Sequence, residues 1–211
     1  MIKPFNKINM SLKETDTEQI ILMAAKEVFF KKGYDGARMQ EIADEAGMNK
    51  ALLHYYFRSK DKLFEAIFND AFQKFIPRVV EKMNSDASFE EKIETFVENY
   101  ITTIIEVPQI PIFVLTELHR NPERIVGMMK RMGVQPQLIF ASMQKNMDEG
   151  KIRVINPRHL LINIIALCVF PFAAKPLLQN MLFDNNSGDY HKFLLERKKE
   201  VCQFIINSVK I

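Results

Sequence analysis

Apolar residues recur along most of the chain at the three- and four-residue spacing of amphipathic α-helices. The cleanest pattern follows Ser88 and stops before Pro108. Its apolar positions are Ile93, Phe96, Val97, Tyr100, Ile101, Ile104 and Ile105. Such patterns fill almost all of the 211 residues, and glycine, a common helix terminator, occurs only 7 times. The sequence therefore predicts an all-α fold.

Capping residues predict where several helices begin. Thr15–Glu18 and Ser88–Glu91 each match a capping box, in which a hydroxyl and a carboxylate satisfy free backbone amides. Ser59 is expected to cap another helix. Asn121 and Asn156 are each followed by proline, a residue favoured at the first helical position, so each predicts one more helix start.

Two long apolar helices are predicted at the end of the chain, about Pro157 to Leu182 and Asp189 to Val209. Their length and apolar character suit pairing with a second copy of the chain. The alternative is that their apolar residues form an intramolecular core. We expect both: some of these apolar residues form the intramolecular core, and others pair with the second copy.

Residues Gln40 to Phe57 have the pattern of two short helices joined by a tight turn. Ile42, Ala43 and Ala46 share the inward face of the first helix, and Ala43 is small enough for two helices to cross there. Gly47 suits the left-handed backbone of the turn, and Asn49 is a good N-cap for the second helix. This is the layout of a DNA-reading helix-turn-helix.

The second of these helices has one apolar face and one exposed face with an unusual composition. Leu53, Tyr56 and Phe57 fall on the side expected to be buried. The opposite side carries Ala51, His54, Tyr55 and Arg58. Aromatic and basic side chains on an exposed face favour a binding surface. The alternative is an amphipathic helical hairpin whose outer residues are only solvated.

Charge is concentrated at the same place. The net charge is only +3, too small for a non-specific architectural DNA protein. Between Met48 and Lys62, four cations stand against Asp61 alone, which also gives +3. The basic excess therefore lies at the proposed DNA-reading segment.

Three segments resemble the N-terminal domain of tetracycline-repressor (TetR) family transcription regulators: 24–34, 40–50 and 53–64. The resemblance implies an N-terminal three-helix domain with a helix-turn-helix plus a C-terminal helical bundle, about nine helices. It places a DNA-binding domain at residues 1–60 and a ligand-binding and dimerisation domain at 61–211, with a connecting helix from about residue 60. It also implies a cytoplasmic repressor that binds double-stranded operator DNA as a homodimer through its last two helices. Two joined half-sites predict a palindromic operator.

The resemblance also implies roles for individual residues at the DNA. Phosphate contacts are expected from Lys50, Tyr55, Tyr56 and Lys60, although Tyr56 is alternatively largely buried. Arg38, Met39 and Gln40 are expected near a phosphate strand. Base reading falls to Ala51, Leu52 and His54, with Asn49 as a further candidate. Leu52, His54 and Arg38 depart from the residues common in the family, so the operator sequence does not follow from the resemblance.

A small, largely apolar effector is implied for the second domain, which is rich in methionine, phenylalanine and helix-breaking proline. The candidate pocket residues are Phe113, Glu117, Met129, Phe140, Met143, Asn163 and Phe170. Each is alternatively a core or solvated residue. A second alternative keeps the DNA binding and replaces the effector with a protein partner or with none.

Other classes of function are disfavoured. The four histidines (His54, His119, His159 and His191) are scattered, and no nucleophile motif or phosphate loop is found, so no enzyme is expected. Cys168 and Cys202 lack metal-ligand spacing and are expected to be buried reduced thiols; no metal or cofactor is predicted. The most apolar run, Leu160 to Phe172, is shorter than a membrane span, and the N-terminal residues lack a signal-peptide pattern.

Overall fold

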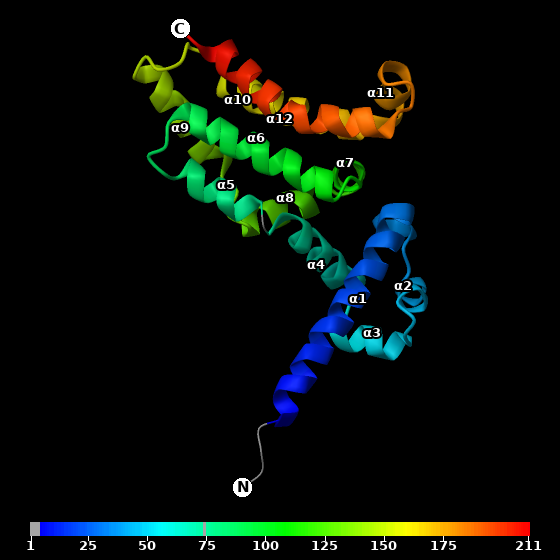
Figure 1. Ribbon diagram of the computed structural model, residues 1–211. Helices are drawn as coiled ribbons and strands as arrows, with labels where there is room; N and C mark the ends of the chain where they lie inside the picture. Colours follow the sequence, from blue (N-terminus) through cyan, green and yellow to red (C-terminus); the bar gives the residue numbers. More distant parts are fainter. Residues whose placement is uncertain (1–4, 74) are drawn as a thin grey trace. The chain divides into compact units, whose positions relative to one another are not determined.

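The computed structural model describes residues 5–73 and 75–211, with side chains from residue 16 onward. Helices and connecting segments account for all the described residues, none of which forms a strand (Figure 1). The helices in this part are α1 (Phe5–Gly36), α2 (Met39–Glu45), α3 (Lys50–Tyr56), α4 (Lys60–Phe72), α5 (Ile76–Met83), α6 (Phe89–Glu106), α7 (Ile110–Arg120), α8 (Pro122–Arg131), α9 (Pro136–Asp148), α10 (Pro157–Ala173), α11 (Lys175–Leu182) and α12 (Ser187–Val209). The predicted all-α fold is confirmed.

Packing divides the chain into two compact units. The first contains Met1–Ala71 together with Leu115–Asn121, the C-terminal end of α7 and the residue after it. The second contains Phe72–Val114 and Pro122–Ile211. Helices α2 and α3 therefore belong to the first unit, and the long C-terminal helices to the second.

Aromatic side chains form the centre of the first unit. Phe64 of α4 is fully buried, with its ring centroid 5.6 Å from that of Phe29 and 5.2 Å from that of Tyr34, both edge to face. Ile42 of α2 and Leu53 of α3 are also fully buried. Aromatic pairs in this geometry stabilise a core beyond the area they bury. Helices α2 and α3 are thus held by the same core that α1 and α4 build.

The second unit is built around α6, with α10 and α12 packed beside it (Figure 1). One buried cluster joins these helices, and its members include Val97, Ile101, Leu160, Ile164, Cys168, Val201 and Ile205. The predicted capping box starts α6 as expected. The Glu91 amide donates to the Ser88 hydroxyl at 3.2 Å, and the Ser88 amide donates to the Glu91 carboxylate at 2.8 Å.

The described residues form twelve helices where about nine were predicted, and two helix boundaries also differ from the predictions. Helix α1 begins at Phe5, so Thr15–Glu18 lies inside the helix and the predicted start there was wrong. The long helix predicted from Pro157 to Leu182 is broken at Ala174 into α10 and α11, which are bent by 72°. Pro176 is the physical reason, because it lacks the N–H that a continuing helix would donate and restricts the residue before it.

Both cysteines are free and buried, as predicted. Burial raises the pKa of the Cys168 thiol to about 12 and that of Cys202 to about 11. Within the described residues no single helix is long and apolar enough to cross a membrane. The pairs α6–α7 and α10–α11 have the required length and composition only when joined across bends of 98° and 72°.

Candidate DNA-binding site

The turn between α2 and α3 is built around a glycine. Gly47 has a φ of +65°, a left-handed conformation that costs least in glycine. Its amide donates to the Asp44 carbonyl at 3.1 Å, and the Met48 amide donates to the Ala43 carbonyl at 2.9 Å. Ala43 has no exposed surface, so a larger side chain there would force α2 away from its neighbours. The hairpin predicted from the sequence is confirmed.

Asn49 starts α3 as predicted. It has extended backbone angles, and its side-chain oxygen accepts a hydrogen bond from the Leu52 amide at 2.8 Å. That bond satisfies one of the free amides of the first turn. One further lone pair on that oxygen and the side-chain NH₂ group remain available for other partners.

The two faces of α3 are clearly separated. Leu53 is fully buried and Phe57 is 7% exposed, whereas Tyr55 is 72% exposed. Lys50, Ala51, Leu52 and Arg58 are exposed, and His54 and Tyr56 are half-buried. The buried side fixes the helix, and the exposed side presents two cations, a phenol and apolar surface. This arrangement leaves the predicted base-reading residues Ala51 and Leu52 free of the core.

The start of α2 offers further polar groups. Arg38 is the N-cap residue; it is exposed, and its side chain makes no capping bond. Met39 is half-buried, and the Gln40 amide nitrogen donates to the Asp44 carboxylate at 2.8 Å. Of these three predicted residues, Arg38 is the charged one, and its side chain is exposed.

Lys60 has a structural role that the sequence did not predict. Its ammonium donates to the Tyr34 carbonyl at 2.9 Å and to the Ala37 carbonyl at 3.1 Å. It also lies 4.3 Å from the centre of the Tyr34 ring, within the range of a cation–π contact. Lys60 thereby ties α4 to the connection between α1 and α2. Its predicted phosphate contact is untested.

We expect Lys60→Ala to lower the free energy of unfolding by about 1–3 kcal/mol, because two partly buried carbonyls lose a charged donor. DNA affinity should fall by a similar factor on all sequences. Urea unfolding and fluorescence anisotropy on two unrelated duplexes would measure both effects. Lys50→Ala is the control, because Lys50 is exposed and its loss should weaken DNA binding with unchanged stability. Unchanged stability in Lys60→Ala would show that the carbonyl contacts contribute nothing.

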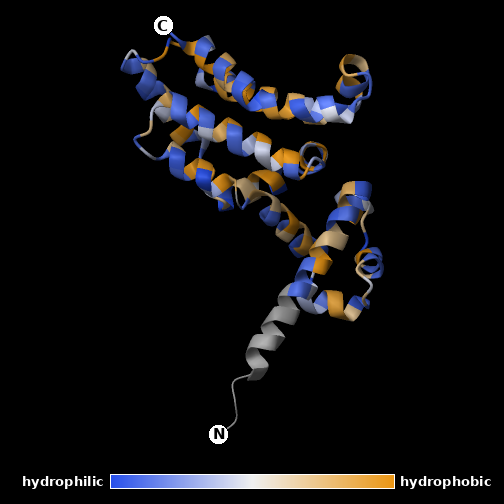
Figure 2. Cartoon of the chain, viewed as in Figure 1, coloured by the Kyte–Doolittle hydropathy of each residue, from blue (hydrophilic) through white to orange (hydrophobic). Residues whose placement is uncertain are grey.

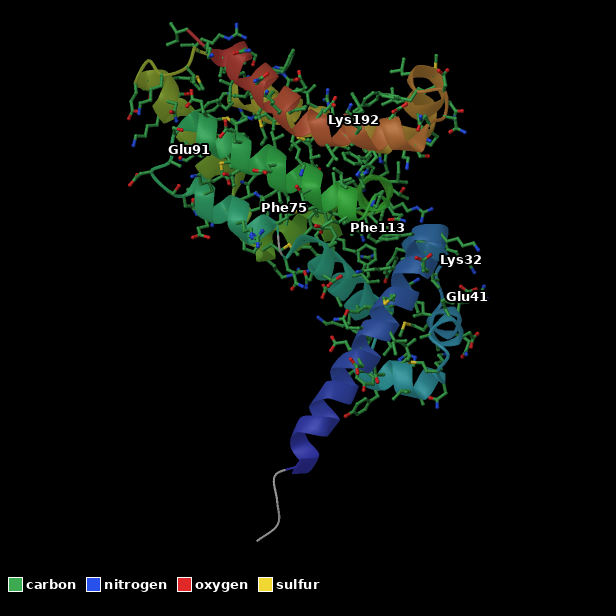
Figure 3. The ribbon with its side chains drawn as sticks, in the orientation of Figure 1. Lys32, Glu41, Phe75, Glu91, Phe113 and Lys192 are labelled. Carbon is green, nitrogen blue, oxygen red and sulfur yellow. The ribbon has the colours of Figure 1, made fainter. Side chains whose placement is uncertain are left out.

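An ion pair joins α1 to α2. The Lys32 ammonium lies 3.0 Å from the Glu41 carboxylate (Figure 3). The hydrogen bond from Lys32 lowers the pKa of the Glu41 carboxyl below its ordinary value. Sequence reasoning missed this pair because the two residues lie on different helices, and no helical spacing relates them. The pair helps to orient α2, and with it the start of the reading hairpin.

The C-terminal end of α7 packs within the first unit. The Glu117 carboxylate, which is 1% exposed, accepts a hydrogen bond from the Tyr34 amide at 3.2 Å. Arg120 lies 3.8 Å from the Asp35 carboxylate. Glu117, a candidate pocket residue in the sequence, therefore lies beside the end of α1.

The remaining candidate pocket residues do not gather in one place. Asn163 and Phe170 line a cavity of about 690 Å³ between α10, α11 and α12. Met143 lines a separate space of only about 40 Å³. Phe113 is buried, while Met129 and Phe140 are half-buried. Sequence reasoning missed the aromatic residues of α12 and its preceding loop that complete the larger cavity, namely Phe183, Phe193 and Phe204.

A buried hairpin that presents a basic and aromatic helix defines the class of helix-turn-helix DNA-binding proteins. A model of the family described as bacterial regulatory proteins, tetR family, matches residues 21–67. The HTH-type transcriptional repressor NicS of Pseudomonas putida is 26% identical over 175 residues, which are 79% of this chain and 80% of NicS.

Two solved structures share the fold. HlyIIR, a hemolysin II transcriptional regulator, has a TM-score of 0.66 and 22% identity, covering 93% of this chain and 98% of that chain. AibR in complex with isovaleryl coenzyme A and operator DNA has a TM-score of 0.59 and 21% identity, covering 74% and 86%. Residues 21–67 therefore form an N-terminal domain of the tetR family of bacterial regulatory proteins, and the protein is a DNA-binding transcription regulator.

Proposed function

We propose that the protein is a cytoplasmic repressor that binds a palindromic operator as a homodimer and is released from it by a small effector. The observation that carries the proposal is the exposed face of α3, where Leu52 and Tyr55 are 39% and 72% exposed although Leu53 behind them is fully buried. Lys50, Tyr55, Tyr56, Lys60 and the residues from Arg38 to Gln40 are proposed to contact phosphates. Asn49, Ala51, Leu52 and His54 are proposed to contact base edges.

The proposed homodimer rests on exposed apolar side chains of the last three helices. Figure 2 shows hydrophobic residues on α11 and, interspersed with hydrophilic ones, along α12. The exposed ones of the three helices are Ile162, Ile165, Phe170, Leu177, Met181, Leu182, Leu195 and Phe204. A group of this size favours a protein interface over solvent. A second copy is the partner that fits, because a palindromic operator requires two reading heads related by a two-fold axis.

The effector proposal rests on the cavity between α10, α11 and α12, whose volume of about 690 Å³ is within the usual range for ligand sites. AibR, which shares the fold, binds isovaleryl coenzyme A as well as operator DNA. We propose residues 61–211 as the domain for effector binding and dimerisation, residues 1–60 as the DNA-binding domain, and no enzymatic activity.

Selection of bound sequences from a random DNA library tests the operator proposal. We expect an enriched motif made of two inverted half-sites. The same selection with Lys50→Ala should enrich the same motif at lower yield, since a phosphate contact carries no sequence information. Enrichment of a single unrepeated half-site, or of no motif, would contradict the proposal.

We expect His54→Ala to change base preference within the half-site, because His54 is half-buried on the edge of the reading face and its ring can donate to or accept from a base. One base pair should lose about 1–3 kcal/mol of discrimination. Repeating the selection with the variant measures the change position by position. Gln40→Ala is the control and should keep the motif, since Gln40 is proposed to lie near phosphates. An identical motif for His54→Ala would remove His54 from the base-reading set.

A further inference from the structure

A proline inside α10 leaves a backbone carbonyl without its helical partner. The Leu167 carbonyl would normally accept from the amide four residues later, but that residue is Pro171, which has no N–H. Arg197 of α12 supplies the missing donor, with its Nη2 atom 2.9 Å from the Leu167 oxygen. The guanidinium of Arg197 is therefore anchored at a fixed place beside α10.

This fixed guanidinium lines the largest of the cavities described above. Apart from Arg197 and Asn163, the lining is apolar: Ala166, Leu167, Phe170, Pro171, Leu178, Leu182, Phe183, Phe193 and Phe204. The Arg197 guanidinium also lies over the Phe193 ring, 5.8 Å from its centre. A cation against apolar walls loses hydration, so it needs a compensating anion.

No compensating anion is found in the part of the chain that the structure describes. No ion pair joins Arg197 to a carboxylate there, although other described residues do form ion pairs. Its Nε atom is buried and has no hydrogen-bond partner. The cavity thus combines hydrophobic walls with one unpaired cation.

We propose that this cavity binds a carboxylate carried on a hydrocarbon chain, with Arg197 holding the carboxylate and the aromatic walls covering the chain. The charge complementarity favours an anionic head, and the apolar lining favours an aliphatic tail. The inference rests on the effector role proposed above and assigns that effector a chemical class. The exposed rim, which includes Phe170 and Phe204, belongs to the face proposed for dimerisation, so a second copy would cover the ligand.

Three probes with the same tail and different heads test the class of ligand: decanoate, decanol and decyltrimethylammonium. Isothermal titration of the full-length protein, below the concentration at which the probes form micelles, measures each affinity. We expect decanoate to bind at least about tenfold more tightly than decanol, because a charge-assisted hydrogen bond is lost with the neutral head. Decyltrimethylammonium should bind most weakly. Equal binding of decanoate and decanol, or no binding because side chains of the second copy fill the cavity, would overturn the proposal.

Variants test the place of binding. Arg197→Met should weaken decanoate at least about tenfold, whereas Arg197→Lys, which keeps a charged donor, should weaken it less. Arg158→Met is the matched control, since Arg158 also lies over a phenylalanine ring, 5.6 Å from the centre of Phe140, but does not line the cavity. If Arg197→Met fails to fold, Ala166→Leu tests the same site. Ala166 is an exposed residue of the cavity lining, and the larger leucine side chain would occupy part of the cavity. Unchanged decanoate binding in Arg197→Met or Ala166→Leu would place the ligand elsewhere.

Operator binding separates the two proposals. If decanoate binds through Arg197 but does not release operator DNA, the cavity is a carboxylate site. It is then not the effector site. Decanoate that releases operator DNA equally from the wild type and Arg197→Met would support an effector and refute this site. If decanoate releases operator DNA from the wild type but not from Arg197→Met, both the carboxylate site and its effector role are supported.

Discussion

Replacing Phe64 with alanine is expected to lower the free energy of unfolding of the first unit by about 3–5 kcal/mol. Phe64 is fully buried, and its ring packs edge to face against Phe29 and Tyr34. The substitution leaves a cavity between α1 and α4, and α2 and α3 depend on the same core. Operator binding should therefore be lost together with stability. Urea unfolding followed by circular dichroism, alongside anisotropy on the selected operator, measures both.

The matched control is another aromatic truncation in the same unit. Tyr55 is 72% exposed, so Tyr55→Ala should change stability by no more than about 0.5 kcal/mol. Its DNA affinity should still fall, because the proposed phosphate contact is removed. The two variants thus separate loss of fold from loss of contact. A loss of less than about 1 kcal/mol in Phe64→Ala would contradict the role given to Phe64, since burial of its full side chain is worth more.

The reading hairpin was predictable because its determinants are local. Gly47, Asn49 and Leu53 act on backbone and side chains within a few residues of themselves. Such features are visible in a short sequence window. The capping box at Ser88 was predictable for the same reason.

The contacts of Lys60 could not be predicted from the residues near it in the sequence. The resemblance implied a phosphate contact for Lys60, but it gave no indication that the ammonium bonds to carbonyls 26 and 23 residues earlier in the chain. Spacing alone contains no information about such a tertiary contact. The Lys32–Glu41 pair was missed for the same reason.

The candidate pocket was only partly predictable, because apolar composition does not distinguish a packed side chain from one that faces a cavity. Asn163 and Phe170 line the large cavity, but Phe113 and Met143 are buried. The cavity forms beside the break between α10 and α11, and that break was predicted as a continuous helix. Pro171 and Pro176 indicated an irregularity there, but the sequence did not locate the bend at Ala174.

A charged residue on the outer face of α12 is expected to make the protein monomeric. Phe204 is 63% exposed and stands among the apolar side chains proposed to pair with a second copy. Phe204→Glu would replace apolar contact area of that interface with a carboxylate, and the desolvation of this charge on dimerisation is costly. Operator affinity should fall about 10²–10⁴-fold, because the two half-sites would no longer be held at a high effective concentration. Sedimentation equilibrium and anisotropy on the full palindrome would measure the two changes.

Gln203→Glu is the control for this variant, because it adds the same charge at the neighbouring exposed and polar position of α12. It should remain dimeric and bind the palindrome with little change. A second comparison uses a single half-site, which the Phe204→Glu monomer should bind as well as one head of the dimer does, since α3 is untouched. A dimeric Phe204→Glu protein with full operator affinity would show that the apolar face of α10, α11 and α12 is not the pairing surface. The two reading heads would then have to be joined through another face of the second unit.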